Sequence, residues 1–108
     1  MKQLRVFIKE PDKDGYVSMV NDNYKDLQKI VGGYLESVPL HSSRKITLLC
    51  DEEGKFKNKK PNLFFMNSND TIVGTVIFVS YNSEGEFKSL TDKQIKFLEE
   101  KFNSIGGN

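Results

Sequence analysis

The stretch from 71 to 79 (Thr-Ile-Val-Gly-Thr-Val-Ile-Phe-Val) limits the fold more than any other part of the sequence. It is apolar on both of its faces, whereas a strand with one face in water alternates between polar and apolar residues. The sequence therefore predicts one strand over 71–79, at the centre of a sheet that is covered on both sides. Gly74 inside this stretch predicts a bulge, a bend or the close approach of another backbone.

Other strands are predicted from alternation and from β-branched residues, and they cover 4–9, 16–20, 34–40 and 45–50. The proline and glycine of the turn at 11–15 make the first two of these strands a hairpin. The segment 51–55 (Asp-Glu-Glu-Gly-Lys) predicts a tight reversal whose carboxylates form a solvated tip. Residues 57–69 have no clean period, and a short helical turn at 62–66 fits them.

Two helices are predicted from their end signals. Asn23 is suited to cap the start of the first helix, and the pair Gly32-Gly33 is suited to end it before the next strand. Thr91 and Gln94 have the spacing of a capping box at the start of the second helix. The buried stripe of the second helix is expected at Ile95, Leu98 and Phe102.

These patterns predict a single α+β domain over residues 1–108. Its sheet is expected to be mostly antiparallel and twisted, with about five to six strands packed with two main helices. The longest apolar stretch, 71–81, is far shorter than the ~20 residues of a membrane span. The chain also runs from Met1 into a strand pattern without an apolar signal segment, so a cytoplasmic location and no membrane partner are expected.

Charge limits the class of partner. Lys and Arg number 16, Asp and Glu number 15, and the formal net charge is +1. A DNA mimic is strongly acidic, and a dedicated nucleic-acid binder usually has a clear basic excess. Extended nucleic acid is therefore not an expected partner.

The sequence offers little catalytic chemistry. Cys50 is the one cysteine, which rules out an intrachain disulfide and favours a small buried apolar side chain. His41 is the one histidine and lies in a polar segment, with no nucleophile motif or cofactor fingerprint elsewhere. The prediction is a protein that is not an enzyme and that uses no cofactor and no metal ion.

Two motifs resemble ligand sites but fit structural roles better. The glycines Gly32-Gly33 follow a helix, and the free groups at a helix C-terminus are carbonyls, which repel phosphate. The carboxylates of Asp51, Glu52 and Glu53 are consecutive, so their side chains diverge and do not converge on one ion. A hinge and a solvated tip are the favoured interpretations.

Four segments in this order carry a family resemblance: Val31-Gly32-Gly33-Tyr34-Leu35-Glu36, Asp51-Glu52-Glu53-Gly54-Lys55, Pro61-Asn62 and Ile72-Val73-Gly74. The chain resembles a family of small uncharacterised proteins of bacteriophages and prophages, a domain of unknown function with VGGY(I/L)E and (D/N)EEGK motifs. The resemblance covers nearly the whole chain.

The resemblance implies a context rather than an activity: a phage accessory protein in the cytoplasm of the infected bacterial host, acting on host machinery or host defence. One class of such proteins sequesters a small nucleotide-like signalling molecule without catalysis, as an oligomer with pockets between subunits. A second class inhibits a host defence protein through an exposed sheet edge or loop. A regulatory or structural accessory role is a third alternative.

The lysines of 55–60, with Phe56 among them, are denser than elsewhere in the chain. They fit either a solvated loop or a flank that binds a small phosphorylated ligand. On the second interpretation Tyr34 stacks on a base, Glu36 contacts a ribose or amino group, and an amide contact comes from Asn62. Phosphate contacts are expected from Lys55 and Lys57.

Overall fold

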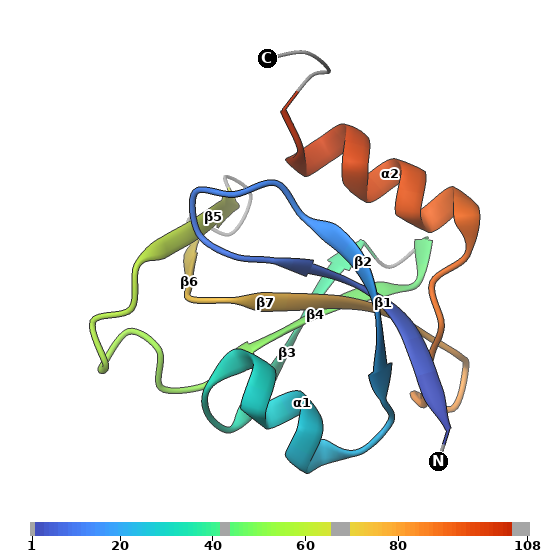
Figure 1. Ribbon diagram of the computed structural model, residues 1–108, viewed down its shortest axis with the longest axis horizontal. Coiled ribbons are helices and arrows are strands. Elements are labelled where there is room, and N and C mark those ends of the chain that lie inside the picture. Colours follow the sequence, from blue (N-terminus) through green and yellow to red (C-terminus); the bar gives the residue numbers. More distant parts are fainter. Residues whose placement is uncertain (1, 42–43, 66–69, 105–108) are drawn as a thin grey trace.

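The computed structural model describes residues 2–41, 44–65 and 70–104, with only the backbone described at His41. Its elements are β1 (Gln3–Lys9), β2 (Tyr16–Asn21), α1 (Tyr24–Val31), β3 (Leu35–His41), β4 (Ile46–Asp51), β5 (Pro61–Phe65), β6 (Asp70–Val73), β7 (Val76–Tyr81), β8 (Phe87–Lys88) and α2 (Asp92–Phe102). The predicted α+β class, with two helices and an antiparallel sheet, is confirmed (Figure 1).

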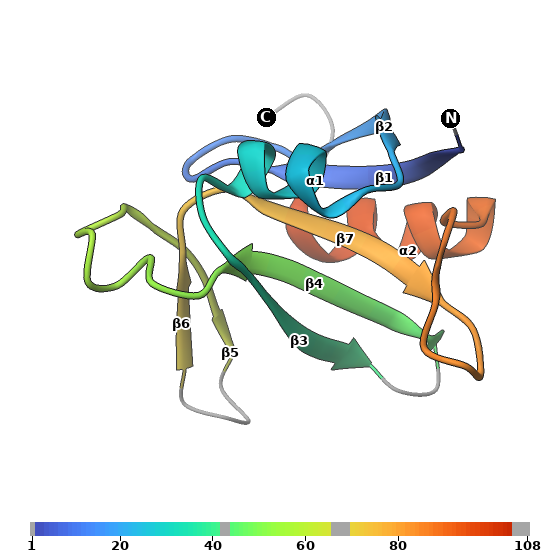
Figure 2. The same ribbon diagram turned by 90° about the horizontal axis from the view of Figure 1, so that it is seen from below.

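Within the described residues, six strands form the main sheet in the order β2-β1-β7-β4-β3, with β8 paired beside β7. Figure 2 shows these strands one below another. All pairs are antiparallel, and Phe78 of β7 lies opposite both Phe7 of β1 and Leu48 of β4. The prediction that the apolar stretch lies at the centre of the sheet is therefore confirmed for β7.

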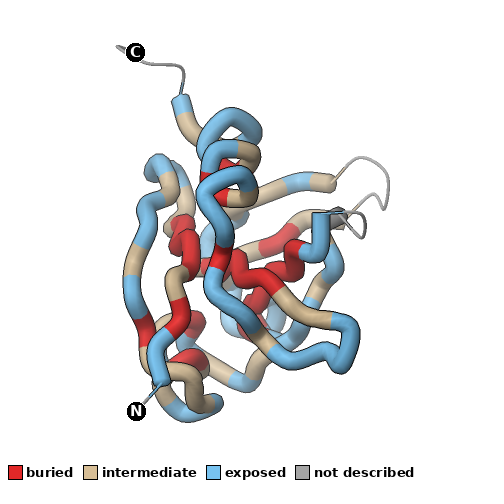
Figure 3. Tube along the Cα trace, turned by 90° about the vertical axis from the view of Figure 1, so that its right-hand side faces the viewer, coloured by how far each residue is buried: buried red, intermediate tan, exposed pale blue. Residues whose placement is uncertain are grey.

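The two helices lie on opposite faces of this sheet (Figure 1). Alternate residues of β7 point to opposite faces, so Phe78 belongs to the apolar cluster that includes Leu98 of α2, while Ile77 belongs to the cluster that includes Leu27 of α1. Figure 3 shows the buried residues gathered along the middle of the molecule, between the two helices. The sheet thus separates two apolar clusters, one under each helix.

The prediction of one strand over 71–79 is wrong, because the chain bends at Gly74. Gly74 has φ +76°, a left-handed conformation that other residues adopt only with strain. The bend sends β6 into a separate two-stranded sheet with β5, in which Leu63 lies opposite Ile72. Of the alternatives for Gly74, the structure has the bend.

The helical turn expected at 62–66 is also wrong. Pro61–Phe65 is the strand β5, and residues 66–69 lie outside the described residues. Leu63 and Phe65 of this strand pack against the apolar cluster under α2. Pairing with β6 and this packing decide the conformation of 61–65. Neither requires an alternation of polar and apolar residues in the segment itself, so the sequence did not indicate a strand.

The predicted helix ends are confirmed. The Asn23 side chain accepts a hydrogen bond from the Asp26 N–H at 2.9 Å, and Gly32 ends α1 with φ +84°. Thr91 and Gln94 form the capping box of α2, with N–H to side-chain distances of 2.9 and 3.2 Å. Ile95 and Leu98 are buried, and Phe102 is half-buried and stacks on Phe78 with ring centroids 5.0 Å apart. Among the described residues, neither helix is long and apolar enough to cross a membrane.

Candidate functional site

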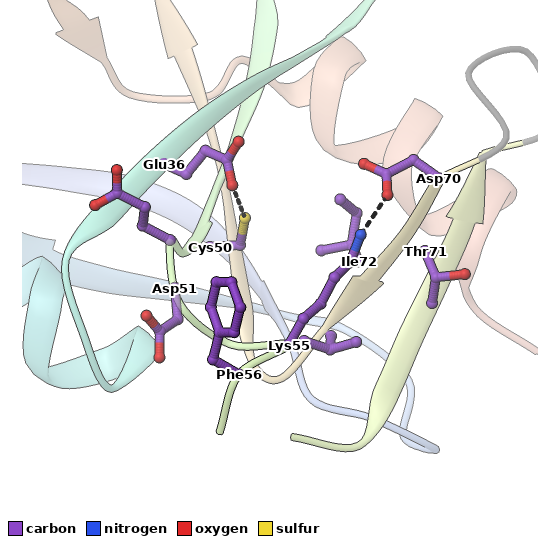
Figure 4. A pocket seen from close by; sticks show the side chains of 10 residues that line it. Glu36, Cys50, Asp51, Lys55, Phe56, Asp70, Thr71 and Ile72 are labelled. Carbon is purple, nitrogen blue, oxygen red and sulfur yellow. Dashed lines mark hydrogen bonds and ion pairs between the residues drawn. The ribbon is translucent and has the colours of Figure 1, made fainter. Parts of the chain in front are cut away.

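A pocket of about 370 Å³ lies where the end of β4 meets β6. We call it the β4–β6 pocket, and Figure 4 shows the side chains that line it. They come from β3, the end of β4, the loop that follows β4, and β6: Glu36, Cys50, Asp51, Glu52, Lys55, Phe56, Asp70, Thr71, Ile72 and Val73.

The apolar part of this pocket combines a buried floor with one exposed ring. Cys50 and Ile72 are buried, with exposed fractions of 4% and 5%. The Phe56 side chain is 89% exposed, and its ring stands among the lining residues, between Cys50 and Lys55 (Figure 4). Because the chain covers almost none of this ring, the ring is available to a ligand.

The charge in the pocket is mainly negative. Lys55 Nζ lies 2.7 Å from Asp70 Oδ1, and this hydrogen bond is the main cause that raises the pKa of Lys55. Glu36 and Glu52 are exposed, and neither forms an ion pair with any described residue. Within the described residues, two carboxylates of the pocket therefore have no cationic partner, whereas its ammonium group is already paired.

The negative charge of the pocket also affects the pKa of the Cys50 thiol. Burial raises its pKa to about 11, and the nearby carboxylates Glu36, Asp51 and Asp70 add to the effect. The thiol therefore stays protonated at neutral pH, and its Sγ lies 3.9 Å from Glu36 Oε1, to which it donates. The prediction that Cys50 is a small buried side chain is confirmed.

Asp51 corrects the expectation of a solvated tip at 51–55, because its side chain is only 1% exposed. Its carboxylate pairs with Lys57 Nζ at 2.8 Å and Lys59 Nζ at 2.7 Å, and it accepts from the Glu53 N–H at 2.9 Å. We call Asp51, Lys57 and Lys59 the Asp51 cluster. A Cβ atom at Gly33 would overlap this carboxylate, so the second glycine of the pair makes room for it.

Burial acts to raise the pKa of Asp51, but the hydrogen bonds from Lys57, Lys59 and the Glu53 backbone together outweigh it. They lower the pKa to about 2. Asp51 is therefore ionised at neutral pH, and its charge is held by the two ammonium groups of the Asp51 cluster.

The lysines of 55–60 hold the loop to the rest of the chain. Lys57 Nζ donates to the Gly32 carbonyl at 3.1 Å, and Lys59 Nζ donates to the Val31 carbonyl at 2.7 Å. These carbonyls close α1, whose C-terminal end attracts cations. Lys60 pairs with Asp12. Each of these four lysines thus has a carboxylate partner in its own chain.

The structure brings together two of the five residues predicted from sequence, because Glu36 and Lys55 both line the β4–β6 pocket. Lys57 does not line the pocket and is paired with Asp51. Tyr34 is 67% exposed and does not line the pocket.

Asn62 lies at another place and ties β5 to neighbouring segments. Its amide donates to the Lys9 carbonyl at 2.9 Å and to the Gly74 carbonyl at 2.7 Å, and its oxygen accepts from Lys9 Nζ at 3.0 Å. Both amide hydrogens are thus used within the chain, which leaves none for a ligand.

The lining residues contributed by β6 were not indicated as a site by the sequence: Asp70, Thr71, Ile72 and Val73. The pocket forms only because Gly74 turns β6 away from β7 and toward the end of β4. That glycine was the one available signal. Over the described residues, no cluster of three or more His, Cys, Asp or Glu side chains is arranged to hold a metal ion.

No curated protein and no solved structure matches this chain. A family model does match, and its description is Domain of unknown function (DUF3846). The match extends over residues 1–103, which include both helices and every strand of both sheets. The predicted membership of a domain-of-unknown-function family is thereby confirmed, and the chain belongs to the DUF3846 family.

Proposed function

We propose that the protein is a non-catalytic binding protein whose β4–β6 pocket takes a cationic side chain, arginine or lysine, from a protein partner. One observation carries this proposal: the exposed Phe56 ring lines the same pocket as Glu36 and Glu52, two carboxylates that form no ion pair with a described residue, and the floor of this pocket is apolar. This combination fits a group that is apolar along its stem and positive at its end.

The chemistry of the pocket favours such a group in two ways. A guanidinium or ammonium over the face of an aromatic ring is attracted by the ring, and a carboxylate nearby accepts its hydrogen bonds. The volume of about 370 Å³ is at the lower end of the usual range for ligand pockets. It suits one long side chain better than a dinucleotide.

The small nucleotide-like ligand expected from the sequence stays a prediction, with less support. A phosphate entering the pocket would meet Glu36 and Glu52 and would have to compete with Asp70 for Lys55. The other lysines of the segment are paired with Asp51 and Asp12. The protein–protein class of function is therefore the better supported one.

The biological context is proposed on the resemblance alone. It points to a phage-encoded protein that counteracts host defence in the infected cell, where the cationic side chain belongs to a host defence protein. A regulatory or structural role in the phage is the alternative. The family description gives no activity, so the pocket chemistry is the part of the proposal to test first.

Nuclear magnetic resonance titration tests the pocket directly. The probes are N-acetyl-arginine amide, a short arginine-containing peptide, a matched glutamate-containing peptide, and cyclic dinucleotides with cyclic ADP-ribose isomers. We expect the two arginine probes to shift the resonances of Phe56, Glu36 and Ile72, and the glutamate peptide to shift none of them.

Two variants and a matched control complete the test. Phe56→Ala is expected to weaken binding of the arginine peptide roughly fivefold, because about 1 kcal/mol of cation–aromatic attraction is lost. Glu36→Gln is expected to weaken it and to make binding less sensitive to salt. Phe64→Ala removes another exposed ring, 56% exposed and outside the pocket lining, and leaves binding unchanged. Binding of a nucleotide at the pocket, or of no arginine probe, would overturn the proposal.

A further inference from the structure

The outer edge of β2 pairs with no strand among the described residues. β2 is the end strand of the main sheet, and its other edge pairs with β1 from Tyr16 to Asn21. Figure 2 shows β2 at the upper margin of the sheet, beyond β1. An end strand presents a row of free backbone donors and acceptors that can pair with another strand.

The two end strands of the main sheet differ in how they are protected. Proteins usually block an open edge with a proline, a charged side chain or a bulge. β3 has all of these features, in Pro39, Glu36 and a shift of register between Pro39 and His41. β2 (Tyr-Val-Ser-Met-Val-Asn) contains neither a proline nor a charge, and its register with β1 is regular. The edge of β2 is thus open to pairing.

β2 also exposes apolar side chains. Val17 and Met19 are 41% and 53% exposed. They lie opposite Phe7 and Arg5 of β1, so both belong to the face of the sheet that α2 covers. Tyr16, on the other face, is 47% exposed. An uncharged edge with apolar side chains on both faces is the surface that strand addition buries.

We infer that β2 pairs antiparallel with β2 of a second copy of this chain, about a twofold axis at Ser18, so that the two main sheets become one continuous sheet. The second copy is the occupant because the strand is complementary to itself. A twofold axis through the sheet keeps each face on its own side, so paired residues must belong to the same face.

This condition leaves few registers, and in one of them apolar side chains of one β2 strand lie opposite apolar side chains of the other. With Ser18 opposite Ser18 of the partner, Val17 lies opposite Met19 on the α2 face, and Tyr16 lies opposite Val20 on the other face. No charge meets a charge along the strand. Beyond its ends Asp14 and Asp22 approach each other, and each has a partner of its own: Asp14 accepts from the Ser104 N–H at 2.9 Å, and Asp22 lies 3.8 Å from Lys2 Nζ.

The first test is the mass of the protein in solution, by light scattering and sedimentation from low to high micromolar concentrations. We expect a dimer whose fraction rises with concentration. Met19→Lys is expected to give a monomer, because two lysines would be buried at the new seam. Phe64→Lys is the matched control, since Phe64 is equally exposed but lies on β5, and it leaves the mass unchanged. A wild-type monomer throughout the range overturns the inference.

Cysteine crosslinking tests the register. Ser18→Cys is expected to form a disulfide between copies under mild oxidation, because residues opposite each other across an antiparallel pair are within disulfide range. Val17→Cys and Met19→Cys are controls on the same edge, displaced along the strand from their own copies and too far apart to link. Crosslinking of either control in preference to Ser18→Cys overturns the register. Neither result depends on a ligand, so this inference stands or falls separately from the proposed function.

Discussion

Asp51 holds three parts of the chain together at the back of the β4–β6 pocket. It is the last residue of β4, it pairs with two lysines of the following loop, and those lysines donate to the carbonyls that end α1. Gly33 leaves room for its carboxylate. The wall of the pocket that includes Glu52 and Phe56 therefore depends on one buried charge.

We predict that Asp51→Asn lowers the free energy of unfolding by about 2 kcal/mol at neutral pH, because it leaves two partly buried ammonium groups without a counter-charge. Equilibrium unfolding in urea, followed by circular dichroism, measures the change. Asp12→Asn is the control: Asp12 pairs with Lys60 at an exposed position, and its loss leaves the stability unchanged. Equal effects of the two substitutions would contradict the role given to Asp51.

The same measurement has a pH dependence with a definite sign. The pKa of Asp51 is lowered from its ordinary value of 3.8 to about 2 in the folded chain, so the folded state holds the ionised form more strongly. Its contribution is present above pH 4 and is lost as the pH falls from about 4 to about 2. The loss is about 2 kcal/mol by linkage, and it is absent from Asp51→Asn.

At the scale of elements, Gly74 decides that the N-terminal part of the apolar stretch leaves the main sheet. It separates β6 from β7, and the stem of Lys59 lies against its α-carbon. A Cβ at this position would lie 2.8 Å from Lys59 Cδ. The bend and the Asp51 cluster are thus in contact through Lys59.

We predict that Gly74→Ala destabilises the protein more than Gly85→Ala does. Both glycines have a similar positive φ, +76° and +81°, so both substitutions cost about 1 kcal/mol in backbone strain. Gly85 has open space around it, whereas an alanine at 74 must also displace Lys59, which adds about 1 to 2 kcal/mol. Urea unfolding of the two variants gives the difference, and equal losses would mean that Lys59 moves aside freely.

What could be predicted from the sequence follows the range of the interactions. The ends of α1 and α2 were predictable because Asn23, Gly32 and Thr91 act on residues only a few positions away. The conformation of β5 was not, because it depends on pairing with β6 and on the packing of Leu63 and Phe65 against the cluster under α2. The burial of Asp51 was not either, because its lysine partners also bind backbone carbonyls of α1, which are distant in the sequence. The site was predicted only in Glu36 and Lys55 for the same reason.

At the scale of the molecule, the two apolar clusters share the strands β1, β4 and β7. Val76 and Phe78 of β7 belong to the cluster under α2, and Ile77 and Val79 belong to the cluster under α1. The clusters therefore have no independent support, since loss of either one exposes a face of β7.

We predict that Leu27→Ala under α1 and Leu98→Ala under α2 each cost about 2 to 5 kcal/mol and lower one common unfolding transition. In both variants, the free energy of hydrogen exchange of the β7 backbone amides should fall by as much as the free energy of global unfolding. Two separable transitions, or β7 amides that respond to only one of the variants, would show that the clusters unfold independently.

The alternation along β7 also fixes which changes of chain length this fold accepts. Inserting or deleting one residue between Gly74 and Phe78 would exchange the destinations of the side chains that follow, so that an aromatic ring would meet α1 and a smaller aliphatic side chain would meet α2. Such a one-residue shift would disrupt the packing of both apolar clusters at once. We therefore expect this fold to accept changes of length in its connecting segments but not between Gly74 and the end of β7.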